Sequence, residues 1–155
     1  MTKEDLQQKA LSIYPEAEAS LETAKAYLNV SVPSEKLHEV AEKLKNDPET
    51  KFDFLFCLSG VDWPEYMEVV YHLRSTTLGH EMVLRGKIND RENARIDSVY
   101  DLWKTAEYHE REVYDLFGVH FNNHPDLRRI FLEDDWVGHP MRKDYVDEVN
   151  IVELK

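Results

Sequence analysis

The residues best suited to chemistry are histidines and carboxylates in the last third of the chain. The histidines there are His109, His120, His124 and His139. Two of them, His120 and His124, have the spacing of metal ligands on one face of a helix. Gly118 and Pro125 bracket that pair, however, and no acidic pair completes a zinc signature. We therefore expect packed or capping histidines, and the alternative is a small metal-dependent hydrolase that uses the histidines and Glu110.

A dense charged run from Glu107 to Asp115 is the second such feature. Projected at 3.6 residues per turn, Glu110 falls inside the apolar arc of a helix. The far side of that helix carries Arg111, Glu112 and Asp115. An isolated buried charge costs several kcal/mol, so we expect Glu110 to accept hydrogen bonds or to form a structural ion pair with Arg128 or Arg129. A general acid is the alternative, but no nucleophile or oxyanion donor in the sequence converges on Glu110.

The sequence offers no site for a redox cofactor. None of the five glycines falls into a dinucleotide or phosphate-loop spacing, so we expect neither NADH nor flavin on this chain. Cys57 is the only cysteine, which excludes a four-thiolate iron–sulfur site and an intrachain disulfide, and which fits a reducing compartment. Because Cys57 lies in an apolar stretch, we expect an inert, packed thiol.

The composition of the chain indicates its size class and disfavours several kinds of binding partner. The chain has 155 residues, 42% of them hydrophobic, which is enough for one domain with one core. Its formal net charge of -12 disfavours binding to nucleic acid and to anionic lipid surfaces. There is no secretory signal and no apolar run long enough to cross a bilayer, so we expect a chain that is cytosolic or faces the cytosol from a complex.

Hydrophobic periodicity predicts helices and strands over the first 118 residues. We expect an amphipathic helix over residues 4–14 and a strand over 26–32. A second helix opens at Pro33-Ser34-Glu35 and ends at Asn46-Asp47-Pro48. Strands are predicted at 52–61, 66–73 and 82–88, antiparallel because their connections are short. A last helix runs to residue 117, with Asp97-Ser98 as N-cap and Gly118 ending it.

From residue 119 onward no helical or strand period persists. We therefore divide the chain into an α+β domain, residues 1–118, and a C-terminal arm, residues 119–155, which we expect to dock on partner proteins. Single apolar residues recur there at irregular spacing: Phe131, Trp136, Met141, Tyr145, Val149 and Ile151. Two basic pairs, Arg128-Arg129 and Arg142-Lys143, stand next to acidic residues. Such groups are typical of a protein–protein interface in which bidentate ion pairs fix how the two proteins align. Trp136 and Tyr145 are the candidate anchor residues of this interface.

Three segments of the sequence resemble the signature of the C-type subunit of bacterial respiratory complex I, the counterpart of the mitochondrial thirty-kilodalton subunit. They are residues 110–119, 124–130 and 136–145. Residues 52–55, 61–62, 69–73 and 98–103 are similar to strands and a helix of that family. Two positions depart from the pattern: Val146 stands where the family usually has proline, and Tyr108-His109 replaces a pair that usually contains tryptophan.

The resemblance implies an α+β fold, with a mixed or antiparallel sheet, helices packed on it and an extended irregular C-terminal arm. It implies a non-catalytic scaffold of NADH:quinone oxidoreductase at the cytoplasmic face of the bacterial inner membrane. The arm would lie on the D-type subunit, which is the large quinone-site subunit, with the B-type and I-type subunits nearby. FMN, iron–sulfur clusters, NADH and quinone would belong to the rest of the complex. A membrane-bound hydrogenase or an F420H2 dehydrogenase is the alternative parent complex.

The resemblance also assigns fold-closing and partner-contact roles, none of them catalytic, to a set of motif residues. They are Glu110, Arg111, Glu112, Asp115, Gly118, His124, Pro125, Asp126, Arg128, Arg129, Trp136, Gly138, Pro140, Arg142, Lys143, Asp144 and Tyr145.

Overall fold

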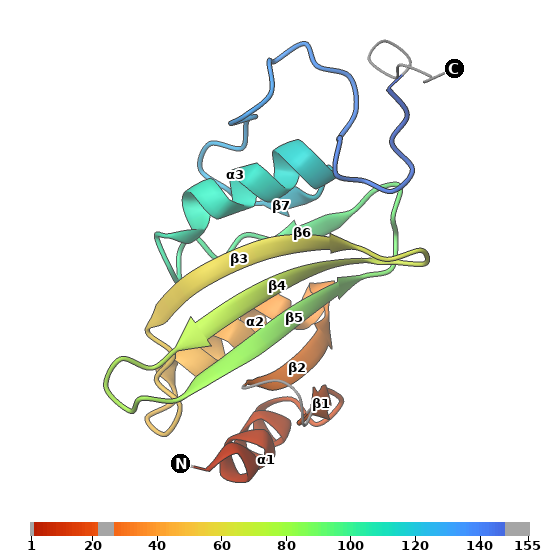
Figure 1. Ribbon diagram of the computed structural model, residues 1–155. Coiled ribbons are helices and arrows are strands. Elements are labelled where there is room, and N and C mark those ends of the chain that lie inside the picture. Colours follow the sequence, from red (N-terminus) through yellow and green to blue (C-terminus); the bar gives the residue numbers. More distant parts are fainter. Residues whose placement is uncertain (1, 22–26, 148–155) are drawn as a thin grey trace.

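The computed structural model describes residues 2–21 and 27–147 (Figure 1). The predicted arm residues from 148 onward, with Val149 and Ile151, and Ala26 of the first predicted strand lie outside the described residues. The elements in chain order are α1 (Lys3–Ile13), β1 (Glu18–Ser20), β2 (Leu28–Pro33), α2 (Ser34–Asn46), β3 (Phe54–Asp62), β4 (Met67–Arg74), β5 (Glu81–Ile88), β6 (Arg95–Asp97), α3 (Ala106–Phe117) and β7 (His120–Asn122).

The main sheet has the strand order β1-β2-β5-β4-β3. Short turns make β3, β4 and β5 antiparallel neighbours, as predicted. Strand β2 pairs in parallel with β5, with Leu28 opposite Met82, and β1 pairs antiparallel with β2. Helix α2 lies behind the strands in Figure 1 and contacts β2 and β5, while α3 lies along β3. The predicted α+β fold with a mixed sheet is therefore confirmed.

The first two helices follow the predicted pattern. Helix α1 begins with a capping box in which Thr2 and Asp5 exchange side-chain and backbone hydrogen bonds. Helix α2 spans Ser34–Asn46, as the flanking prolines predict. Its predicted apolar stripe faces the sheet and is buried: Leu37, Val40, Ala41 and Leu44.

Strand β3 corrects the expectation for Cys57. The pairing register between β3 and β4 shifts between Leu55 and Cys57, which indicates a bulge. The extra residue changes the phase of the strand, so that Cys57 is exposed while Leu58 is buried. Further along, Gly60 faces α3, where an added Cβ would lie 3.0 Å from Val113 and 2.9 Å from Phe117. Close approach of α3 to the sheet therefore requires glycine at this position.

The segment before α3 differs from the prediction. Residues 98–105 are not helical and contain turns at 100–102 and 104–105, and the helix begins only at Ala106. Ser98 is not its N-cap, because the Ser98 hydroxyl donates 2.6 Å to Glu110 instead. Gly118 ends the helix as predicted, with φ of 75° and its amide bonded to Tyr114 O.

Three short strands were not predicted, because three residues are too few to show a period. Strand β1 adds an edge to the main sheet, and β6 pairs in parallel with β7, Ile96 lying opposite Phe121. The expectation of no strand after residue 119 is therefore wrong for His120–Asn122. The division of the chain at residue 118 stays a prediction, and β7 beyond it is paired with β6 before it.

Candidate functional site

Glu110 lies fully buried beneath the turn that precedes α3. One carboxylate oxygen accepts the Ser98 hydroxyl at 2.6 Å, and the other accepts the Val99 amide at 2.8 Å. The predicted hydrogen bonds are confirmed, whereas the predicted ion pair is wrong. Arg128 and Arg129 contact Asp126 and Asp115 instead.

Burial raises the pKa of Glu110 to about 7, although the hydrogen bonds from Ser98 and Val99 act in the opposite direction. His124 Nε2 lies 3.8 Å from the carboxylate but only 3.0 Å from the carbonyl oxygen of Glu107. Because His124 Nδ1 accepts the Asp126 amide, we assign the neutral ring with its proton on Nε2. These contacts tie the 98–99 and 124–126 segments to α3.

A first polar cluster, here called the helix clasp, joins α3 to the C-terminal arm through Arg111, Asp115 and Arg129. One Asp115 oxygen accepts Arg129 Nη1 at 2.7 Å. The other accepts three consecutive arm amides, those of residues 130, 131 and 132, at 3.1, 2.7 and 3.0 Å. Arg111 and Asp115 lie on the far side of the helix, as projected, yet both are buried. They are only 6% and 0% exposed, because the arm covers that side of the helix.

The helix clasp also closes a loop in the arm. Arg129 Nη2 donates to the carbonyl oxygens of Trp136 and Gly138, both at 2.9 Å. Arg111 donates to the carbonyl oxygens of residues 128 and 129 at 3.1 and 3.0 Å. Burial raises the pKa of Asp115, but the Arg129 guanidinium and the three amides outweigh it and hold that pKa below its usual range. The carboxylate therefore stays charged at neutral pH.

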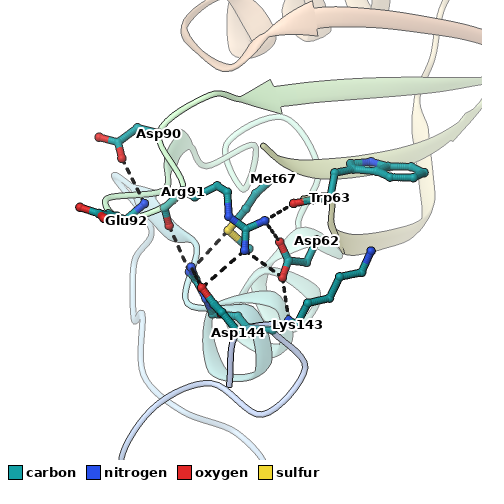
Figure 2. Close-up of polar contacts among 9 residues, drawn as sticks. Asp62, Trp63, Met67, Asp90, Arg91, Glu92, Lys143 and Asp144 are labelled. Carbon is teal, nitrogen blue, oxygen red and sulfur yellow. Dashed lines mark hydrogen bonds and ion pairs between the residues drawn. The ribbon is translucent and has the colours of Figure 1, made fainter. Parts of the chain in front are cut away.

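A second cluster, the sheet clasp, fixes residues 142–144 of the arm near the end of β3 (Figure 2). It consists of Asp62, Arg91, Arg142 and Asp144. Asp62, with 2% of its side chain exposed, forms an ion pair with Arg91 and accepts the Lys143 amide at 2.8 Å. Arg142 forms a two-pronged pair with Asp144 at 2.9 and 3.1 Å and donates to the carbonyl oxygen of Arg91 at 3.1 Å. The Arg142 guanidinium lowers the pKa of Asp144 to about 2.

Most of the predicted motif residues gather in these two clasps or under the turn before α3. The helix clasp contains Arg111, Asp115 and Arg129 and binds the carbonyl oxygens of Trp136 and Gly138. The sheet clasp contains Arg142 and Asp144 and binds the Lys143 amide. His124 lies 3.8 Å from Glu110 and accepts the Asp126 amide. The Tyr145 ring covers Gly138, Pro140 is half-buried, and Glu112, Pro125 and Arg128 are exposed. Contact roles with partners stay predictions for all of them.

Asp62 and Arg91 belong to the sheet clasp but were not in the predicted set. The sequence pattern could have indicated Asp62, because side chains two residues apart in a strand point to the same side of the sheet. Asp62 therefore faces the same covered side as Leu58 and Gly60. A carboxylate on that side needs a partner. Nothing local marks Arg91, which lies 29 residues away in the chain.

The outer side of the arm carries large apolar side chains. The exposed ones are Ile130 at 36%, Phe131 at 64%, Val137 at 86%, Met141 at 56% and Val146 at 67%. They lie in a segment whose backbone is fixed from the inner side by buried polar groups. Several large exposed apolar side chains on one ordered segment are typical of a protein interface.

Metal sites and membrane spans are both absent from the described part of the chain. No group of three or more histidine, cysteine or acidic side chains there could hold a metal ion. No helix among residues 2–21 and 27–147 is long and apolar enough to cross a membrane.

The sequence pattern of one known family covers both clasps. The family model described as "Respiratory-chain NADH dehydrogenase, 30 Kd subunit" matches residues 30–149. This chain belongs to that family. The resemblance seen in the sequence is therefore confirmed.

Two curated relatives differ in how much of their length this chain matches. The NADH-quinone oxidoreductase C/D subunit of Phocaeicola vulgatus is 48% identical over 122 residues, which cover 78% of this chain and 23% of that protein. The chain thus spans less than a quarter of the length of such C/D relatives. The NADH-quinone oxidoreductase C subunit of Roseiflexus castenholzii is 45% identical over 121 residues, covering 76% of this chain and 68% of that protein.

Two solved structures share the fold. One is in the membrane-bound sulfane sulfur reductase, an archaeal respiratory membrane complex. It has a TM-score of 0.77 at 30% identity and covers 94% of this chain and 86% of that chain. The other is a trypsin-resistant fragment (1–134) of Nqo5, with a TM-score of 0.69 at 32% identity, covering 82% of this chain and all of that fragment. The α+β fold of this chain is thus shared with both solved structures.

Proposed function

We propose that this chain is a non-catalytic scaffold subunit in the peripheral arm of a NADH:quinone oxidoreductase. The observation that carries the proposal is the two-sided C-terminal arm. Buried ion pairs fix its backbone on the inner side, while Phe131, Val137 and Met141 are exposed on the outer side. An ordered apolar surface of this kind is stabilised when another protein covers it.

The D-type subunit is the proposed main partner. Relatives named C/D support this choice, because they match this chain over only 23% of their length and join it to further sequence in one polypeptide. The B-type and I-type subunits are proposed as further neighbours. FMN, iron–sulfur clusters, NADH and quinone would be held by other subunits, and the complex would face the cytoplasm at the bacterial inner membrane. The chain would support electron transfer and proton translocation by fixing the geometry of these subunits.

A second candidate parent is another energy-converting membrane complex, such as a membrane-bound hydrogenase or an F420H2 dehydrogenase. The similarity to a chain of the archaeal sulfane sulfur reductase, with a TM-score of 0.77, supports this alternative. The subunits that accompany this chain would discriminate between the two, since only the first parent brings an NADH-oxidising flavoprotein.

Native purification of the tagged chain from its source membrane tests the proposal. We expect a D-type subunit and a flavoprotein to accompany it in stoichiometric amounts. The double variant Phe131→Ser/Val137→Ser should reduce the recovered D-type subunit about tenfold or more. The control is Leu78→Ser, whose side chain is 46% exposed at the far end of the sheet.

Two outcomes would contradict the proposal. The first is a chain that purifies without other subunits. The second is an isolated chain that carries stoichiometric flavin, zinc or iron, and zinc or iron would favour the metal-dependent hydrolase.

A further inference from the structure

An open cleft lies where the C-terminal arm meets the sheet. Its volume is about 390 Å³, and it is lined by Gly60, Val61, Asp62, Trp63, Phe117, Met141 and Lys143. One wall is the end of β3 with the C-terminal end of α3, and the other is the arm. We call it the seam cleft. It exists only while the arm is held against the domain.

The seam cleft presents an apolar surface with a cation at its rim. Trp63 is 40% exposed and Met141 is 56% exposed, and the ring of Phe117 lies half-buried beside Gly60. The Lys143 ammonium lies 5.8 Å from the centre of the Trp63 ring, and Figure 2 shows the two side chains next to each other. The Asp62 carboxylate does not add a negative charge to this surface, because its ion pair with Arg91 neutralises it.

Hydrogen bonds to the main chain fix both walls before anything binds. The Asp62 carboxylate accepts the Lys143 amide at 2.8 Å, and Arg91 bridges that carboxylate to the carbonyl oxygen of Trp63. On the other side, the Met141 amide donates 2.9 Å to the carbonyl oxygen of Leu116. A site held in this way loses little conformational entropy when it is filled.

We infer that the seam cleft receives an apolar side chain of the D-type partner, with a carboxylate of that partner next to Lys143. This inference rests on the proposed function and adds the place and the chemistry of one contact. An apolar surface of this size suits one or two aliphatic or aromatic side chains. The rim cation favours a carboxylate in the partner. The cleft continues the apolar outer side of the arm, of which Met141 is part.

Affinity measurements between this chain and its D-type partner test the inference, with the partner prepared as the complex lacking this chain. Met141→Glu and Lys143→Glu change only exposed side chains and keep the two amide hydrogen bonds. Each should raise Kd at least tenfold, because an acidic group would oppose the apolar contact or the carboxylate. Lys143→Arg keeps the charge and should stay within about threefold of wild type.

Matched controls carry the same changes away from the cleft. Leu78→Glu alters an apolar side chain of similar exposure in the turn between β4 and β5, at the other end of the sheet. Lys104→Glu alters a lysine that lies 3.7 Å from the Tyr100 ring, near the start of α3. Both should bind within about twofold of wild type, and circular dichroism should show the same fold for all variants.

The outcomes separate this inference from the proposed function. If the wild-type chain does not bind the partner, the proposed function fails first. If it binds, and Met141→Glu and Lys143→Glu bind equally well, the seam cleft has no such role while the proposed function stands. If these variants abolish self-association of the chain and leave partner binding unchanged, the occupant is a second copy and the inference is wrong.

Discussion

Asp115→Asn should detach the C-terminal arm from α3. The substitution keeps the size of the side chain but removes the charge that Arg129 and three arm amides share. Asparagine has one acceptor oxygen, so its amide group must face either the guanidinium or the amides. Removing one member of a buried ion pair costs about 3–5 kcal/mol. Since Arg129 keeps 12% side-chain exposure, we expect roughly 3 kcal/mol at neutral pH.

Urea denaturation and hydrogen exchange together measure this effect. If the arm opens locally, the amides of residues 130–132 should exchange about a hundredfold faster, which corresponds to roughly 3 kcal/mol, while core amides change little. Asp126→Asn is the matched control, because Asp126 pairs with Arg128 in solvent, and it should leave the exchange unchanged. Equal exchange of residues 130–132 in both variants would show that Asp115 does not hold the arm.

The stabilisation that the Asp115 carboxylate provides should decrease as the pH is lowered. The pKa of Asp115 lies below its usual value of 3.8 in the folded chain. A lowered pKa gives stability that is fully present above the unfolded value and is lost as pH falls through the folded value. The difference in free energy of unfolding between wild type and Asp115→Asn should therefore be constant at neutral pH and shrink below about pH 4. A difference that grows in acid would refute the assignment.

Three further predictions concern single positions. The pKa of Glu110 rises from 4.5 to about 7 on folding, so the stability that its protonated form contributes is full below pH 4.5 and is lost as pH rises through 7. The free energy of unfolding of Glu110→Gln, measured by urea denaturation, should therefore increase relative to wild type by up to roughly 3 kcal/mol between about pH 5 and pH 8. A difference between the two proteins that does not change with pH would contradict this. Gly118→Ala should lower the free energy of unfolding by about 1–3 kcal/mol and with it the melting temperature, since φ at Gly118 is 75° and an added Cβ would lie 2.5 Å from the His139 ring. An unchanged melting temperature would count against this helix end. Cys57 should react with a thiol reagent in the native state, and reaction only after denaturation would place it inside the sheet.

The periodic elements were predictable because burial and backbone geometry agree in them. The apolar stripe of α2 and the strands β3 to β5 each span at least two full periods, and prolines, glycines or polar turn residues mark their ends. The antiparallel arrangement of those strands follows from short turns. The parallel pairing of β2 with β5 could not be deduced, because it joins segments about 50 residues apart and leaves no local signal.

The two clasps show where local patterns are insufficient. Projection on a helix gives the correct side for Arg111 and Asp115, yet both are buried because a segment without any period folds over them. The partner of Glu110 was predicted from charge alone, and the turn at Ser98 supplied hydrogen bonds instead. A bulge of one residue was enough to turn Cys57 outward. Each miss concerns a contact between distant segments, which a single sequence does not encode locally.

The parallel ladder between β2 and β5 has a consequence for biosynthesis. β2 cannot complete its pairing until Lys87 has emerged from the ribosome, because its parallel neighbour β5 is synthesised about 50 residues later. Until then the nascent chain exposes one side of β2, with unpaired amide and carbonyl groups that other strands could join. Translation speed across residues 34–88 should therefore influence how much newly made protein aggregates, independently of the stability of the finished fold.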